Sequence, residues 1–284
     1  MLSSMPNPPS DVETRRTSAD AVLGGEALIV APHPDDEILG CGGLIAASSD
    51  PVRIRVLVAS DGAGSPPAGA SDSGLAGRRL EESLTALEDL GIPPRNVLAA
   101  GLPDGELQRS RAELRETIAS ALVDATGVPR TLLVPFRFDR HPDHMAVCRA
   151  GLEAARRCGS RVWEYFVYPT WKWMRPNDIR AHLQIDALAV ISLEPAVREA
   201  KRRALDRFTS QIGTPYPGQV RPVLSEGFLD ALCSVDEVFL DSAAVGSGSD
   251  ALRRHRTRFA IVRRLEPPLK RAKDRWMERL GPRK

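Results

Sequence analysis

The hydrophobic pattern of the chain alternates between short apolar runs and longer stretches with apolar residues at helical spacing. The first run, Leu28–Ala31, is rich in Ile and Val and is typical of a buried strand. After it, apolar residues from Ile38 to Ile45 recur along one helix face, which predicts a strand, a sharp turn and a helix. The same reasoning predicts further strands at 53–59, 96–100, 131–136, 186–193 and 235–240, a strand-like start to 161–173, and helices at 76–90, 110–124, 144–157 and 195–208. Strands alternating with helices predict one α/β domain with a Rossmann-like, mainly parallel sheet.

Two of the predicted helices carry further sequence signals. In the helix at 76–90, four leucines fall on one side and are expected to face the core: Leu80, Leu84, Leu87 and Leu90. Ser110 and Glu113 have the spacing of a capping box, which predicts the start of the helix at 110–124.

Composition suggests how the chain is divided. Residues 1–24 are rich in Pro, Ser, Asp and Thr and lack the basic start and apolar centre of a signal peptide, so we predict a disordered leader. Residues 25–241 form the predicted folded domain, and 242–284 a linker and tail. The four cysteines form no C-x-x-C pair, which favours reduced thiols and a cytoplasmic protein.

The tail is strongly basic. Residues 251–284 hold thirteen Lys/Arg and three Asp/Glu, so they carry +10, and the remaining 250 residues carry −8 of the net +2. Apolar residues at helical spacing between these cations (Leu269, Ala272, Trp276 and Leu280) predict a basic amphipathic helix in 252–284. Such a helix would give peripheral contact with the inner face of a membrane. The alternatives are a solvated helix on the acidic body or a disordered tail, and no motif supports binding to nucleic acid.

Candidate chemistry follows two of the predicted strands. His33, Asp35, Asp36 and Glu37 come directly after the first strand, and a second cluster (Asp139, Arg140, His141, Asp143 and His144) follows the strand at 131–136. The carboxyl ends of parallel strands meet at one sheet edge, so the two clusters can converge. His33 and Asp36 with one His of the second cluster give two imidazoles and a carboxylate, a ligand set for catalytic zinc. Taken singly, each cluster could instead be an ordinary helix start.

The two clusters resemble the motifs of the PIG-L/LmbE-like family of zinc-dependent N-deacetylases. The resemblance rests on five segments: Pro32-His33-Pro34-Asp35-Asp36-Glu37 with Gly40-Cys41-Gly42-Gly43, His141-Pro142-Asp143-His144, Arg79 to Gly91, Leu102-Pro103-Asp104-Gly105, and Ser210-Gln211. It implies that His33, Asp36 and His144 bind the metal and that Asp35 is the general base. It also implies that Arg79 and Asp104 bind substrate. Otherwise Arg79 would pair with Glu82 on a solvated helix face, and Asp104 would be a turn residue.

Two more residues have expected roles near the metal. His141, three residues before His144, would lie beside the metal and stabilise the oxyanion, and Asp143 could orient an imidazole. A Gly/Ala/Pro/Ser loop at 62–74 and an aromatic-rich stretch at 161–173 are candidates for the substrate pocket, although ordinary connection and core packing explain them as well.

The predicted function is removal of an N-acetyl group from an amino sugar or an N-acetylglucosamine-containing glycoconjugate, small or lipid-linked. Zinc is the expected cofactor and Fe²⁺ the alternative. Other predictions consistent with the sequence are an amidase for another acylated amine in secondary metabolism, and a noncatalytic metal-binding scaffold. An intact Asp35 and His141 argue against the scaffold, which would need neither.

Overall fold

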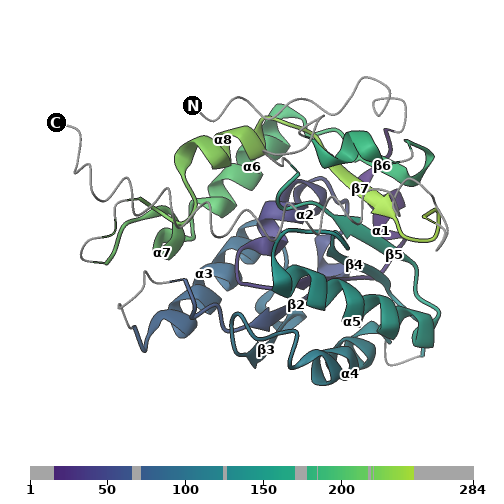
Figure 1. Cartoon of the computed structure of the whole chain (residues 1–284). Coiled ribbons are helices and arrows are strands. Elements are labelled where there is room, and N and C mark those ends of the chain that lie inside the picture. Colours follow the sequence, from purple (N-terminus) through teal and green to yellow (C-terminus); the bar gives the residue numbers. More distant parts are fainter. Residues whose placement is uncertain are drawn as a thin grey trace.

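The computed structural model describes residues 16–65, 72–123, 127–169, 178–183, 185–216, 219 and 221–245. Their centre is a seven-stranded sheet of order β3-β2-β1-β4-β5-β7-β6 (Figure 1). The strands are β1 (Ala27–Ala31), β2 (Ile54–Ser60), β3 (Val97–Leu102), β4 (Thr131–Pro135), β5 (Val162–Tyr165), β6 (Leu188–Ile191) and β7 (Glu237–Asp241). The helices are α1 (Ala19–Leu23), α2 (Asp36–Ala46), α3 (Leu75–Asp89), α4 (Arg111–Leu122), α5 (Pro142–Cys158), α6 (Pro195–Leu205), α7 (Thr209–Ile212) and α8 (Glu226–Cys233). The predicted α/β fold with a mainly parallel sheet is confirmed.

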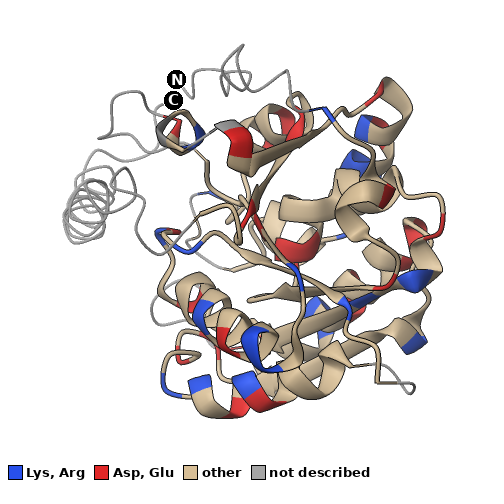
Figure 2. Ribbon diagram, turned by 90° about the vertical axis from the view of Figure 1, so that its right-hand side faces the viewer, with Lys and Arg blue, Asp and Glu red and all other residues tan. Residues whose placement is uncertain are grey.

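Helices cover both faces of the sheet. Apolar side chains of α1, α2, α3, α6 and α8 pack on one face, and those of α4 and α5 on the other. Every residue of β1 is buried, as expected for a central parallel strand between two helical layers. Figure 2 shows the acidic and basic residues mainly on helices and loops around strands that are mostly uncharged. All four cysteines are free thiols, and Cys41, Cys148 and Cys233 are buried.

One side of the sheet is antiparallel. Strand β7 pairs antiparallel with both β5 and β6, so it enters between two strands that precede it in sequence. The hydrophobic pattern predicted a strand there but could not predict its direction, because burial alternates in the same way in either direction.

Three local predictions were wrong. Residues 16–24 are not a disordered leader: α1 buries Val22 and Leu23 against the core, and Arg16 forms a bridge with Val190. Ser110 precedes α4, but its side chain makes no capping hydrogen bond. In α3, Leu80 and Leu84 are only half-buried, because the fully buried face is turned to present Arg79, Ser83 and Leu87.

Some predictions concern residues outside the described ranges. These include the basic tail at 252–284 with its membrane contact, residues 66–71 of the loop at 62–74, and 170–177 of the aromatic stretch. Of the aromatic residues of this stretch that the structure describes, Trp163, Tyr165 and Phe166 are buried in the core. Among the described helices, none combines the length and the apolar character needed to cross a membrane.

The topology brings the two predicted clusters together. Strands β1 and β4 are parallel neighbours, so their carboxyl ends lie side by side, with α2 starting after β1 and α5 after β4. Strands β2 and β3 end at the same edge, where Asp61 and Asp104 follow them. Four chain segments therefore contribute polar residues to one place.

Candidate active site

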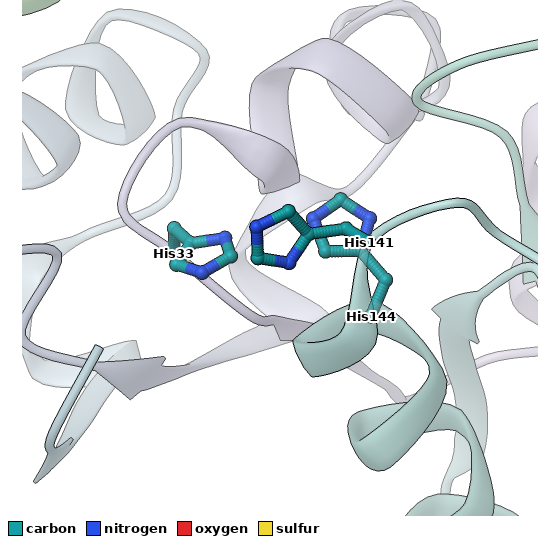
Figure 3. A group of neighbouring side chains, drawn as sticks. All are labelled: His33, His141 and His144. Carbon is teal, nitrogen blue, oxygen red and sulfur yellow. The ribbon is translucent and has the colours of Figure 1, made fainter. Parts of the chain in front are cut away.

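Two imidazole nitrogens, one from each cluster, lie close to one carboxylate oxygen. Asp36 Oδ2 lies 3.0 Å from His33 Nδ1 and 3.2 Å from His144 Nε2. Ligands about 2.0–2.1 Å from a tetrahedral zinc ion would be about 3.3 Å apart, so both separations from Asp36 fit ligands of one metal. One ring nitrogen from each of His33, His141 and His144 also lies within 4.8 Å of the others. His33 is 9 % exposed, Asp36 2 % and His144 1 %, and three buried titratable groups with no apolar role fit a metal-binding function. Figure 3 shows the rings of His33, His141 and His144 grouped, with His33 from the loop after β1 and the other two from the start of α5.

In the metal-free protein these three groups strongly shift one another's pKa values. Burial alone would raise the pKa of Asp36, but the imidazoles of His144 and His33 outweigh it and hold the pKa well below its usual range. Burial alone would lower the pKa of His144, but Asp36 and Asp139 raise it to about 9. The pKa of His33 is likewise well above its ordinary value, since hydrogen bonds to Asp104, Asp143 and Asp36 outweigh burial. The carboxylates around the two imidazoles therefore stabilise positive charge at this place, as a cation site requires.

The second nitrogen of His33 faces two further carboxylates. His33 Nε2 lies 3.2 Å from Asp104 Oδ1 and 3.4 Å from Asp143 Oδ2. Asp143 is in turn fixed by the N–H groups of Gly105 and Leu107, at 2.8 and 3.2 Å. These contacts hold the ring with Nδ1 turned toward Asp36. Asp143 was expected to orient an imidazole, and the imidazole that it contacts is that of His33.

Asp35 lies beside this group in a strained conformation. Its φ is +133°, and its carboxylate accepts a hydrogen bond of 2.8 Å from Arg79 Nη2. Burial raises the pKa of Asp35 to about 7, against the opposing charge of Arg79. A carboxyl group with a pKa near neutrality can accept a proton at working pH and release it again.

Arg79 is buried, not on a solvated helix face. Besides Asp35, it donates to the carbonyl oxygens of Pro34 and Gly62, at 2.6 and 2.8 Å. The alternative pairing with Glu82 is wrong, because Glu82 accepts hydrogen bonds from Thr209 and Ser210 instead. Asp104 contacts His33 and accepts the Gly64 N–H at 2.9 Å. Substrate binding by Arg79 and Asp104 stays a prediction.

His141 is held as a neutral ring. Its Nδ1 accepts the Asp143 N–H at 3.3 Å, so the ring proton of neutral His141 lies on Nε2. Burial, with the nearby His144 and His33, lowers its pKa to about 4. His141 can therefore donate a hydrogen bond near pH 7 without carrying a charge.

The comparisons with known proteins agree with this geometry. Residues 28–155 match the family model described as PIG-L, GlcNAc-PI de-N-acetylase. This segment of the chain is similar to the PIG-L family. The match includes both His/Asp clusters and excludes α6, α8, β6 and β7.

Two curated proteins have 32 % identity to this chain over the matched segments. One is the diacetylchitobiose deacetylase of Thermococcus kodakarensis, matched over 139 residues, which cover 47 % of this chain and 50 % of that protein. The other is the 2'-N-acetylparomamine deacetylase of Streptomyces fradiae, matched over 149 residues, which cover 46 % of this chain and 53 % of that protein. The chain thus spans about half the length of these curated relatives.

A solved structure shows the same fold. The zinc-inhibited form of teicoplanin deacetylase Orf2 superposes with a TM-score of 0.54 over 76 % of this chain and 97 % of that one, at 18 % identity. At this identity the similarity concerns the fold alone.

Sequence reasoning missed several contacts of the site. Asp139 Oδ2 lies 3.4 Å from His144 Nδ1, and the Tyr168 ring stacks on the His144 ring at 5.9 Å and 19°. Ser83 of α3 donates to Glu37 at 2.5 Å. Asp139 and Glu37 belong to the two motifs, so their closeness to the site could have been predicted from the sequence. The positions of Tyr168 and Ser83 depend on how α3 and the end of β5 pack, which no local pattern reports.

Proposed function

We propose that the protein is a zinc-dependent N-deacetylase that releases acetate from an N-acetylated amino sugar. The observation that carries this proposal is the convergence of His33 Nδ1, Asp36 Oδ2 and His144 Nε2, with the Asp35 carboxylate on the adjacent residue. The names of both relatives describe removal of acetyl groups from amino-sugar compounds, which supports this substrate class. Diacetylchitobiose and N-acetylparomamine are small molecules, so we propose a small substrate ahead of the lipid-linked form.

In this proposal His33, Asp36 and His144 hold the metal. A zinc ion there would act as a Lewis acid toward the amide carbonyl and would make a water molecule more acidic. Asp104 and Asp143 keep the His33 ring in the orientation that turns Nδ1 toward Asp36. Fe²⁺ is the alternative metal, because the same ligand set suits it.

Asp35 and His141 move and hold the protons. Asp35, with its pKa of about 7, takes a proton from the attacking water as it adds to the carbonyl carbon. The Nε2–H of neutral His141 donates to the carbonyl oxygen as negative charge develops on it. Asp35 then returns the proton to the leaving amine, because His141 with a pKa of about 4 has no spare proton near neutrality.

Metal content and acetate release test the proposal together. The wild type, Asp35→Asn and the exposed control Asp50→Asn would be analysed by elemental mass spectrometry. Each would then be assayed with diacetylchitobiose, 2'-N-acetylparomamine and a lipid-linked N-acetylglucosamine. We expect one zinc in all three proteins, wild-type turnover in Asp50→Asn, and a fall of roughly 10²–10⁴-fold in kcat for Asp35→Asn. A wild type that binds no metal would refute the metal site, and a metal-loaded wild type that releases no acetate from any of the three would refute the amino-sugar substrate.

A further inference from the structure

The backbone of Asp35 is strained. Asp35 is the only non-glycine residue with a positive φ in the part of the chain that the structure describes, and its ψ is −29°. Side chains with a Cβ rarely adopt this conformation, and it persists only where the surrounding structure fixes it. Contacts with the surrounding residues must therefore hold Asp35 in this conformation.

The peptide group that joins Pro34 to Asp35 is held at its carbonyl and at its N–H by buried side chains. Arg79 donates one hydrogen bond to the Pro34 carbonyl, at 2.6 Å, and one to the Asp35 carboxylate, at 2.8 Å. On the amide side, Glu37 Oε2 accepts the Asp35 N–H at 3.1 Å. The Asp35 carbonyl accepts the N–H groups of Ile38 and Leu39, at 3.0 and 2.9 Å, which anchors it to the first turn of α2.

Helix α3 supports the amide side through a serine. Ser83 Oγ donates to Glu37 Oε1 at 2.5 Å, and both residues have no exposed surface. Ser83 is one turn after Arg79 on α3, so this one helix contacts Asp35 both directly and through Glu37. This explains why the buried face of α3 carries Arg79 and Ser83 where the leucine pattern predicted an apolar face.

We propose that Glu37, oriented by Ser83, is a positioning residue that holds the Asp35 peptide in its strained conformation and so aims the Asp35 carboxylate at the reacting water. The inference rests on the proposed function, in which Asp35 is the base. Glu37 has no contact with the three proposed metal donors in the described structure, so its effect passes through the Asp35 N–H. A small displacement of a catalytic group is enough to slow the reaction strongly.

The test compares Glu37→Leu, Glu37→Gln and Ser83→Ala. Leucine has a similar volume but cannot accept the Asp35 N–H, so kcat should fall roughly 10–100-fold while KM and metal content stay unchanged. Glutamine can accept the Asp35 N–H and donate to Ser83, so Glu37→Gln should keep most of the wild-type kcat. Ser83→Ala should give a smaller fall in kcat, and the Glu37→Leu/Ser83→Ala double variant should lose no more than Glu37→Leu, because both act through one contact.

A control separates positioning from loss of stability. Ile118→Ala removes core volume in α4, on the other face of the sheet from α2 and α3, and should destabilise the protein without lowering kcat. If Glu37→Leu is too unstable to purify, Ser83→Ala decides: an unchanged kcat there would refute the role of Glu37. Losses in the double variant that add independently, or equal losses in Glu37→Gln and Glu37→Leu, would refute it as well.

A crystal structure of Glu37→Leu gives a result that does not depend on turnover. The proposal expects the φ of Asp35 to move to a negative value, whereas an unchanged positive φ would overturn it. This measurement also separates the two proposals. A wild type inactive on acetamido sugars, with a relaxed Asp35 in the variant, would reject the proposed function and keep the positioning role of Glu37.

Discussion

Replacing Lys201 by Met should lower the free energy of unfolding by about 3 kcal/mol, because it breaks a buried ion pair. Lys201 has no exposed surface, and its Nζ donates to Glu237 Oε1 at 2.7 Å and to the Leu39 carbonyl at 3.0 Å. Glu237 also accepts the N–H groups of Gly43 and Leu44, each at 2.7 Å. The pair therefore contacts both ends of one turn of α2, the helix that begins with Asp36.

The partner substitution should be more harmful. Glu237→Gln leaves Lys201 without its counter-ion, and the amide nitrogen cannot accept the second of the two α2 N–H groups. Breaking the pair costs about 3–5 kcal/mol and one unpaired buried N–H about 1–3, so we expect a loss of about 4 kcal/mol or more. In the double variant Lys201→Met/Glu237→Gln no charge is left buried, so its loss should also be about 4 kcal/mol, well below the sum of the single losses.

Urea unfolding of the four proteins measures this coupling. The metal should be removed by a chelator in every sample, since bound metal stabilises the folded state by mass action. The midpoint should fall at constant slope, and the melting temperature of Lys201→Met should drop by roughly 6–12 °C. Arg203→Met is the matched control: Arg203 is on the same helix, and its ion pair with Glu199 is solvent-exposed, so its removal should change stability by less than about 1 kcal/mol. Single losses that add within about 0.5 kcal/mol in the double variant would refute the reasoning.

Three further predictions follow from the site and its supports. The pKa of His144 in the metal-free protein is raised to about 9 from 6.5, so its protonation contributes stability fully below pH 6.5 and loses it as pH rises through 9. Chemical denaturation from pH 6 to 10 should show a decline of up to about 3 kcal/mol that zinc abolishes; a flat profile without metal would contradict this. His141→Ala should lower kcat roughly 10²–10³-fold with zinc content unchanged, and a parallel loss of zinc would instead make it a ligand. Gly40→Ala would place a Cβ against the Tyr165 ring and should destabilise by about 1–3 kcal/mol, whereas Gly77→Ala meets open space on α3 and should be neutral or stabilising in thermal unfolding.

The parallel half of the fold could be predicted because its signals are local. Strand β1 is buried along its whole length and β4 at every residue after Thr131, and each strand is followed by a polar motif that starts a helix. The proximity of the proposed metal ligands was predictable for the same reason: His33 and Asp36 are three residues apart, and His144 follows a strand that pairs with β1. Helices α1 and α8 were missed because five and eight residues are too few to establish a period.

The parts that could not be predicted depend on contacts between distant segments. Arg79 has the sequence environment of a surface helix residue, and its burial follows from the loop after β2 and the turn after β1 meeting α3. The same holds for Asp104, whose contact with His33 requires β2 and β3 to end at one sheet edge. Spacing along the chain identifies candidate catalytic and metal-binding residues, but it does not predict which side chains contact one another.

Lys201 and Glu237 show what this means for the site as a whole. Both lie outside residues 28–155, the part that matches the PIG-L family model, on α6 and β7. Yet they bind the backbone of α2 from Leu39 to Leu44, immediately after the turn that presents Asp35 and Asp36. Gly43 makes this approach possible, since a Cβ there would lie 2.9 Å from the Glu237 carboxyl carbon. Gly43 is therefore explained by a residue 194 positions away, and the matched segment is held in place by contacts from α6 and β7 to the backbone of α2.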